Sequence, residues 1–185
     1  MVPLMELWLP IALATLLCFF VGAILHMAIP LHRNDWRPLA DQDGVIAALR
    51  KAGVTPGNYM FPAMDPQKMK DPVVLQKLAE GPSGVMTVRA PGPIVMGPYL
   101  MKQFVFHLLV SYVIAYLASR TLAPGAEYLQ VFRVAGTAAL LAYIAAIFPE
   151  AIWYHQPRHY VVGKTVDGLV WGLLTAGSFA GFWPN

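Results

Sequence analysis

Long apolar runs separated by polar segments dominate the chain. Four of these runs, roughly residues 7–29, 99–119, 129–153 and 166–183, reach the length of about 20 residues that a helix needs to cross the hydrocarbon core of a bilayer. Aromatic residues stand at many of their ends, which is typical of the membrane–water interface. The pattern therefore predicts an all-α membrane protein whose four transmembrane helices form a bundle.

Composition supports the membrane class. Hydrophobic residues make up 57% of the 185 residues and charged residues only 12%, and the mean hydropathy is +0.54. A soluble domain carries about 25% charged residues. The lipid bilayer is thus the first expected partner. The net charge of +3 comes mostly from residues near the ends of the apolar runs, so it indicates orientation in the membrane, and nucleic acid is not an expected partner.

Residues 31–98 form the one sizeable polar region of the chain, and we expect a mostly irregular extramembrane insert in a single membrane domain, 1–185. Asp43 predicts the start of a short helix over residues 45–52. The Asp71-Pro72 pair begins a second short helix, which Gly81 ends. Residues 85–88 and 94–96 flank a Pro-Gly turn, which indicates a small β-hairpin.

Lysine and arginine residues are unevenly distributed between the two predicted sides of the membrane. The side shared by the insert and the last loop carries six of them near span ends: Arg33, Arg37, Arg89, Lys102, Arg158 and Lys164. The opposite side carries Arg120 and Arg133. The positive-inside rule then predicts a cytoplasmic insert and two outer termini, in a bacterial inner membrane.

Small and polar residues recur at helical spacing in every apolar run, which indicates the faces that turn toward the bundle centre. In the third run the stripe of Ala135, Ala139, Ala142 and Ala146 continues to Glu150. The fourth run carries a ridge of Gly168, Gly172, Ala176 and Ala180. The same spacing places His26 and His107 on the inner faces of the first two runs.

Ionisable residues gather at one membrane face, because successive spans alternate in direction. Asp167 and His32 flank this face, together with the candidate metal ligands His26, His107, Glu150, His155 and His159. Imidazole and carboxylate ligands suit zinc, iron, copper or manganese, so a transition metal or haem is the possible cofactor. We expect Glu150 within hydrogen-bonding or one-water reach of at least one of His26, His107 and His155. The alternative is that these side chains bind only headgroups or backbone, as polar residues at span ends often do.

The sequence lacks a complete catalytic motif, such as a Gly-rich phosphate loop, a Gly-x-Ser-x-Gly turn or His-Glu-x-x-His. It therefore favours a non-catalytic, multi-pass subunit of a larger membrane assembly or homo-oligomer over an enzyme. A membrane metal- or haem-binding redox protein is one alternative. Another is transport of protons or a small solute along a path of hydroxyl groups from Thr15, Ser111, Thr175 and Ser178.

Overall fold

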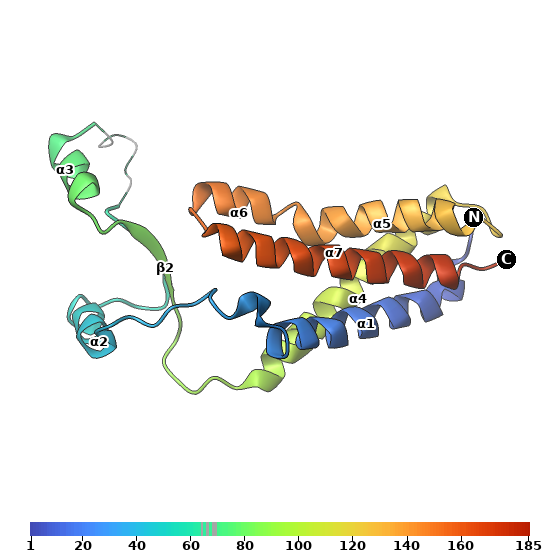
Figure 1. The fold of residues 1–185 in the computed structure, drawn as a ribbon, viewed down its shortest axis with the longest axis horizontal. Helices are drawn as coiled ribbons and strands as arrows, with labels where there is room; N and C mark the ends of the chain where they lie inside the picture. Colours follow the sequence, from blue (N-terminus) through green and yellow to red (C-terminus); the bar gives the residue numbers. More distant parts are fainter. Residues whose placement is uncertain (64, 66, 68–69) are drawn as a thin grey trace. The chain divides into compact units, whose positions relative to one another are not determined.

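The computed structural model describes residues 1–185 except 64, 66, 68 and 69, and it is mostly helical (Figure 1). The chain divides into two compact units. The first comprises residues 1–36 and 95–185, and the second comprises residues 37–94. The candidate functional residues all belong to the first unit.

Four long helices build the first unit: α1 (Trp8–Met27), α4 (Met96–Thr121), α5 (Tyr128–Ile144) and α7 (Arg158–Gly181). Helix α1 packs on α4 and α7, and α5 packs on the same two helices, so the four close into a ring. Three short helices extend them: η1 (Leu4–Leu7), η2 (Pro30–His32) and α6 (Ile147–Trp153). The N- and C-termini lie at one end of this bundle (Figure 1).

Among the described residues, three helical stretches are long and apolar enough to span a membrane: Leu4–Met27, Met96–Thr121 and Tyr128–Trp153. They match three of the four predicted spans to within a few residues. Helix α7 covers the fourth predicted span but is not one of these candidates, so a four-span bundle is not confirmed. The polar residues that α7 contains, such as Asp167, Thr175 and Ser178, are buried inside the bundle.

Helices α5 and α7 approach each other closely because glycines lie between them. A Cβ atom added to Gly172 would come within 2.7 Å of Leu140 Cδ2, and one added to Gly136 would come within 3.1 Å of Ala176 Cβ. Small residues allow such close approach between helices. The predicted ridge of α7 is confirmed, since its four members are all buried: Gly168, Gly172, Ala176 and Ala180.

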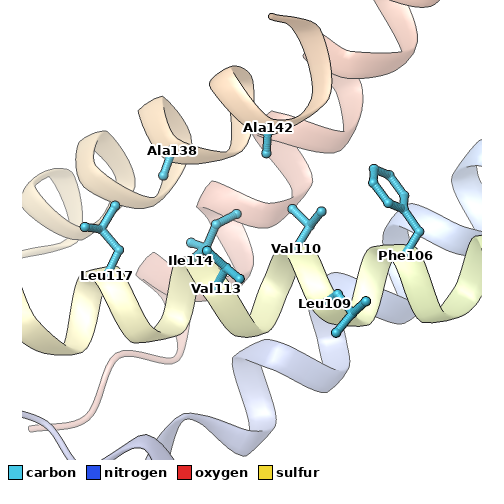
Figure 2. A pocket seen from close by; sticks show the side chains of 8 residues that line it. All are labelled: Phe106, Leu109, Val110, Val113, Ile114, Leu117, Ala138 and Ala142. Carbon is cyan, nitrogen blue, oxygen red and sulfur yellow. The ribbon is translucent and has the colours of Figure 1, made fainter. Parts of the chain in front are cut away.

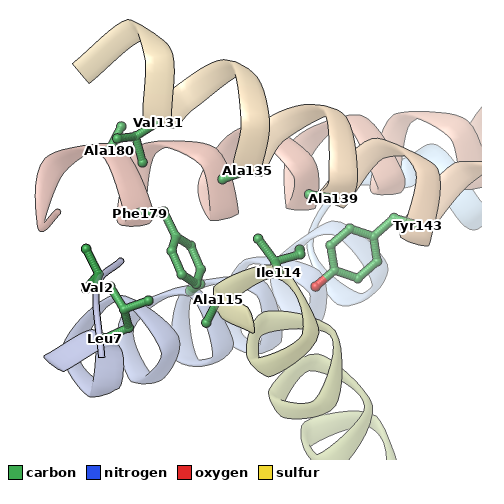
Figure 3. Packing of buried hydrophobic residues seen from close by; sticks show 11 residues of the cluster. Val2, Leu7, Ile114, Ala115, Val131, Ala135, Ala139, Tyr143, Phe179 and Ala180 are labelled. Carbon is green, nitrogen blue, oxygen red and sulfur yellow. The ribbon is translucent and has the colours of Figure 1, made fainter. Parts of the chain in front are cut away.

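The hydrophobic core of the bundle contains residues from all four long helices and the N-terminal segment (Figure 3). Phe179 of α7 is fully buried, and Val2 and Leu7 lie on the α1 side of it. On α5 Val131, Ala135, Ala139 and Tyr143 are buried at steps of four residues, and Gly136 is buried beside them. Ala142 and Ala146, which the sequence placed on the inner stripe, are exposed, because the buried face continues through Tyr143 instead.

Two short helices in the second unit were predicted, and both form. Helix α2 (Gln42–Lys51) begins earlier than expected, since the Asp41 side chain, rather than Asp43, accepts the capping hydrogen bond from Gly44 N. In α3 (Pro72–Glu80) the Asp71 side chain accepts from Val73 N, as predicted. Gly81 ends α3 with a φ of 60°, a backbone conformation that glycine adopts without strain.

The predicted hairpin is wrong in its partner strand. Strand β2 (Gly84–Val88) pairs antiparallel with β1 (Gly57–Phe61), which precedes α3, and residues 94–96 take no part in the sheet. Pro91 and Pro93 lack the backbone N–H that a strand uses in pairing, which disfavours a returning strand there. The Pro91-Gly92 turn therefore does not form a hairpin, and β2 pairs instead with β1 on the other side of α3 in the sequence.

Candidate metal site at one end of the bundle

Three side chains from separate elements converge at the end of the bundle opposite the termini. His26 lies in the last turn of α1, His32 in the short helix η2, and Asp167 in the third turn of α7. One nitrogen of each imidazole and one carboxylate oxygen all lie within 4.8 Å of one another. We call His26, His32 and Asp167 the end cluster. Its donors are two imidazoles and one carboxylate.

Asp167 is the buried member of the end cluster, with 0% of its side chain exposed. Its Oδ1 lies 3.0 Å from His32 Nε2, and its Oδ2 lies 3.6 Å from His26 Nε2. Among the described residues, Oδ2 has no hydrogen-bond partner. A buried carboxylate is costly unless a cation or hydrogen-bond donors compensate it. The orphaned oxygen therefore faces a position that suits a cation.

Both imidazoles are oriented by acceptors on their outer nitrogens. His26 Nδ1 lies 3.0 Å from the carbonyl oxygen of Gly22, and His32 Nδ1 lies 2.7 Å from Asp35 Oδ2. A neutral ring that donates from Nδ1 to this acceptor has its lone pair on Nε2, where a metal ion would bind. Metal-binding histidines show this arrangement, with the second nitrogen donating to a carboxylate or a carbonyl group. Both Nε2 atoms point toward Asp167.

The spacing of these atoms matches that of ligands around one small metal ion. Two ligands at the zinc bond length stand about 3.3 Å apart in a tetrahedral site. The two separations from Asp167 to the imidazole nitrogens, 3.0 and 3.6 Å, fall on either side of this value. The contact between His32 Nε2 and Asp167 Oδ1 requires either a proton or a cation between the two atoms.

A haem held between the two imidazoles does not fit the end cluster. The rings of His26 and His32 are stacked, with centroids 4.1 Å apart and an interplanar angle of 12°. Two axial imidazoles would have to approach a haem iron from opposite faces of a wide, flat macrocycle. Stacked rings that share one carboxylate leave no such slot between them. Because the two rings are nearly parallel, a single ion shared with Asp167 would require one ring to turn so that both Nε2 lone pairs converge on it.

Solvent reaches the end cluster from the side of His26, whose side chain is 38% exposed. A cavity of about 320 Å³ adjoins it and is lined by His26, His32, Arg33 and the intervening residues 27–30. Lys164 Nζ lies 3.3 Å from His26 Nε2 and 3.7 Å from Asp167 Oδ2. The cluster thus has an exposed side and a fully buried carboxylate at its base.

His107, a predicted ligand, lies in the bundle interior and has both nitrogens engaged. Its Nε2 is 3.0 Å from Gln103 Nε2, and its Nδ1 is 3.3 Å from the Tyr143 hydroxyl. Its ring also packs edge-on against Trp171, with centroids 4.9 Å apart. These partners satisfy a buried histidine without a metal. His107 is not part of the end cluster.

The other predicted ligands do not join His26 either. Glu150 and His155 are exposed, and neither makes a side-chain hydrogen bond or ion pair in the part of the chain that the structure describes. His159 Nε2 contacts the carbonyl oxygen of Asn34 at 2.8 Å. The expected pairing of Glu150 with a histidine is not found.

A break in the helix explains why Glu150 was misplaced. Helix α5 ends at Ile144, and α6 begins at Ile147, so the helical period is not continuous between Ala139 and Glu150. His155 follows with a φ of 50°, a left-handed conformation, and Pro157 caps the start of α7. The sequence did indicate that His32 and Asp167 flank this face. It offered no reason to prefer them over Glu150.

A second cavity, of about 260 Å³, lies between α4 and α5 (Figure 2). It is lined by apolar side chains such as Phe106, Val110 and Ala138, which offer no group for chemistry. Two of the four hydroxyl groups of the predicted path bond within their own helices: Thr15 donates to Ile11 O and Ser178 to Leu174 O. The end cluster is therefore the stronger candidate site.

Comparison with known proteins finds no family model, no curated protein and no solved structure that matches the chain.

Proposed function

We propose that this protein is a membrane protein that binds one divalent transition-metal ion at the end cluster. One observation carries the proposal. The Nδ1 atoms of His26 and His32 contact acceptors outside the cluster, and their Nε2 atoms lie beside the buried carboxylate of Asp167, one oxygen of which has no hydrogen-bond partner among the described residues. Most buried polar atoms in folded proteins have a hydrogen-bond partner. Among the described residues Asp167 Oδ2 has none, and its ion pair with Lys164 is long, at 3.7 Å, so a metal ion would compensate this oxygen at closer range.

The donor set narrows the identity of the ion. Two neutral imidazoles and one carboxylate suit zinc, and the same set with open positions suits non-haem iron(II). Calcium and magnesium prefer oxygen ligands alone. When bound, such an ion keeps at least one position for water or a substrate, where it can act as a Lewis acid. His26, His32 and Asp167 would hold the ion, and Asp35 and the Gly22 carbonyl would orient the two rings.

Metal titration of the purified full-length protein tests this proposal. The protein is stripped with a chelator in mild detergent and titrated with zinc against a chromophoric competitor. Wild type should bind one equivalent, and Asp167→Ala should abolish this binding. Asp35→Ala should weaken it by about 10–100-fold, the usual effect of losing an outer-shell partner.

A matched control uses a histidine at the same end of the first unit. His155→Asn removes an exposed imidazole, and asparagine tolerates the left-handed backbone at this position. This variant should bind zinc like wild type. The proposal is wrong if wild type shows no saturable binding, or if Asp167→Ala binds as tightly as wild type does.

The three candidate spans indicate a membrane protein, and we propose the remaining details of its topology. Helix α7 would be the fourth span, since the bundle hides its polar side chains from lipid. The unequal numbers of lysine and arginine support a cytoplasmic insert and two outer termini, in a bacterial inner membrane. The end cluster would then lie at the cytoplasmic face.

The predicted role as a non-catalytic subunit of a larger assembly, or as a homo-oligomer, stays a proposal. Its support is the sequence, which lacks a complete catalytic motif. The metal proposal does not depend on it, because all three ligands come from one chain. A redox role would need an ion such as iron at the same site. Transport has less support, since two of its four expected hydroxyl groups bond to their own helices.

A further inference from the structure

Lys164 occupies the position that the proposed ion would take. It stands one turn before Asp167 on α7, and its ammonium group approaches two of the atoms assigned to the ion, His26 Nε2 at 3.3 Å and Asp167 Oδ2 at 3.7 Å. The two atoms belong to different helices, and Lys164 is the one lysine or arginine of the described residues that forms an ion pair with Asp167.

The ammonium group and a metal ion exclude each other at His26. Because His26 Nδ1 faces the Gly22 carbonyl oxygen, the lone pair of the ring lies on Nε2. That lone pair accepts a hydrogen from Lys164. A single nitrogen lone pair binds either an N–H donor or a metal ion, and both cations would also compete for Asp167 Oδ2. Metal binding at the end cluster therefore requires that Lys164 leave.

Lys164 is loosely held in the cluster, so its departure is feasible. The 3.7 Å separation from Asp167 Oδ2 exceeds hydrogen-bonding distance, whereas a well-seated charged pair approaches to about 2.7–2.9 Å. The side chain is 30% exposed, and Nζ also lies 5.7 Å from the centroid of the Tyr160 ring, where a cation–π contact is available. The flexible stem of lysine can carry the ammonium group away from His26 and Asp167 while α7 stays in place.

We infer that Lys164 is a built-in competitor of the metal, which compensates Asp167 when the ion is absent and is displaced when the ion binds. The inference rests on the proposed metal site and adds its regulation. A buried carboxylate without any cation would destabilise the bundle. With Lys164 present, the metal-free protein stays folded and the ion is exchangeable. The cluster is thus built for reversible metal binding rather than for a permanent structural ion.

The zinc affinity of Lys164→Met tests the inference. Methionine keeps an unbranched apolar side chain and removes the competing charge. Lys164→Met should bind zinc more tightly than wild type by about tenfold or more, the scale on which groups next to metal ligands alter affinity. Lys102→Met is the matched control: it removes an exposed lysine of α4 that makes no ion pair among the described residues, and its affinity should equal that of wild type.

The outcomes distinguish competition by Lys164 from the metal site on which it rests. If wild type binds zinc and Lys164→Met binds it no more tightly, Lys164 is not a competitor, while the metal site stands. If neither protein binds zinc, the metal site itself is refuted, and the inference with it. Should Lys164→Met fail to fold, acylation of Lys164 in wild type, followed by mass spectrometry, gives a second measure. Zinc should accelerate this modification, and an unchanged or slower rate overturns the inference.

Discussion

Replacement of Gly168 by alanine tests the close packing of α5 on α7. The new Cβ atom would lie 2.5 Å from Ile144 Cγ1 and 3.2 Å from the backbone oxygen of Tyr143. Carbon atoms pack best at about 3.5–4.0 Å, so the first contact overlaps by about 1 Å. Ile144 is stiff at χ1, and the Tyr143 oxygen belongs to the backbone, so neither moves aside easily. Overpacking of this kind costs about 1–3 kcal/mol.

Gly177 of the same helix supplies the control. A Cβ atom there would meet no atom within 4 Å, so Gly177→Ala gains only the higher helix propensity of alanine, about 1 kcal/mol. Both variants receive that gain, and the difference between them isolates the steric cost. We expect Gly168→Ala to have a free energy of unfolding about 1–3 kcal/mol lower than that of Gly177→Ala.

Reversible unfolding in mixed micelles, followed by circular dichroism, measures this difference. The two midpoints should separate, with Gly177→Ala at or above wild type. Equal midpoints would refute the reasoning, because they would mean that α5 and α7 are not held at the separation that the glycines permit. Both variants are unfolded in the presence of a chelator, because Gly168 directly follows Asp167 of the end cluster in the chain.

Two further predictions concern Glu150 and the topology. Glu150→Ala should change the free energy of unfolding by no more than about 0.5 kcal/mol, because the side chain is exposed. A loss of about 1–3 kcal/mol in the same unfolding assay would instead support the buried pairing with a histidine that the sequence suggested. A reporter active only outside the cytoplasm should work when fused after Asn185. An inactive fusion, together with labelling of insert cysteines by impermeant reagents in intact cells, would invert the proposed topology.

The sequence predicts the helices of the bundle well because hydrophobicity alone determines most of them. Predicted runs 7–29 and 99–119 correspond to α1 and α4 with shifts of a few residues. The ridge of small residues on α7 was also evident, since its spacing of four is unbroken from Gly168 to Ala180. These features depend only on local composition and on the spacing of residues along one helix, and both can be read from a single sequence.

The candidate site was only partly predictable, because its members come from segments that a helical period cannot relate. His26 was predicted from the helical spacing of the first apolar run, but its side chain is 38% exposed rather than turned into the bundle. His32 lies beyond Pro30 in a separate turn, and its position depends on the path of the chain after α1 ends. The alanine stripe that predicted an inward-facing Glu150 crosses the break between α5 and α6, where the helical periodicity of the chain is interrupted. Periodicity is informative only within one unbroken helix.

The burial of Asp167 distinguishes the end cluster from the polar residues that are common at the ends of membrane helices. Glu150 and His155 are exposed, whereas the Asp167 side chain is wholly enclosed. A Cβ atom at Gly163 would lie 3.1 Å from His32 Cε1, so the bare backbone of α7 provides the space for this ring. His32 is further fixed by carboxylates on both nitrogens. Its orientation is therefore set by the fold before any ion arrives, which is the preorganisation that a metal site requires.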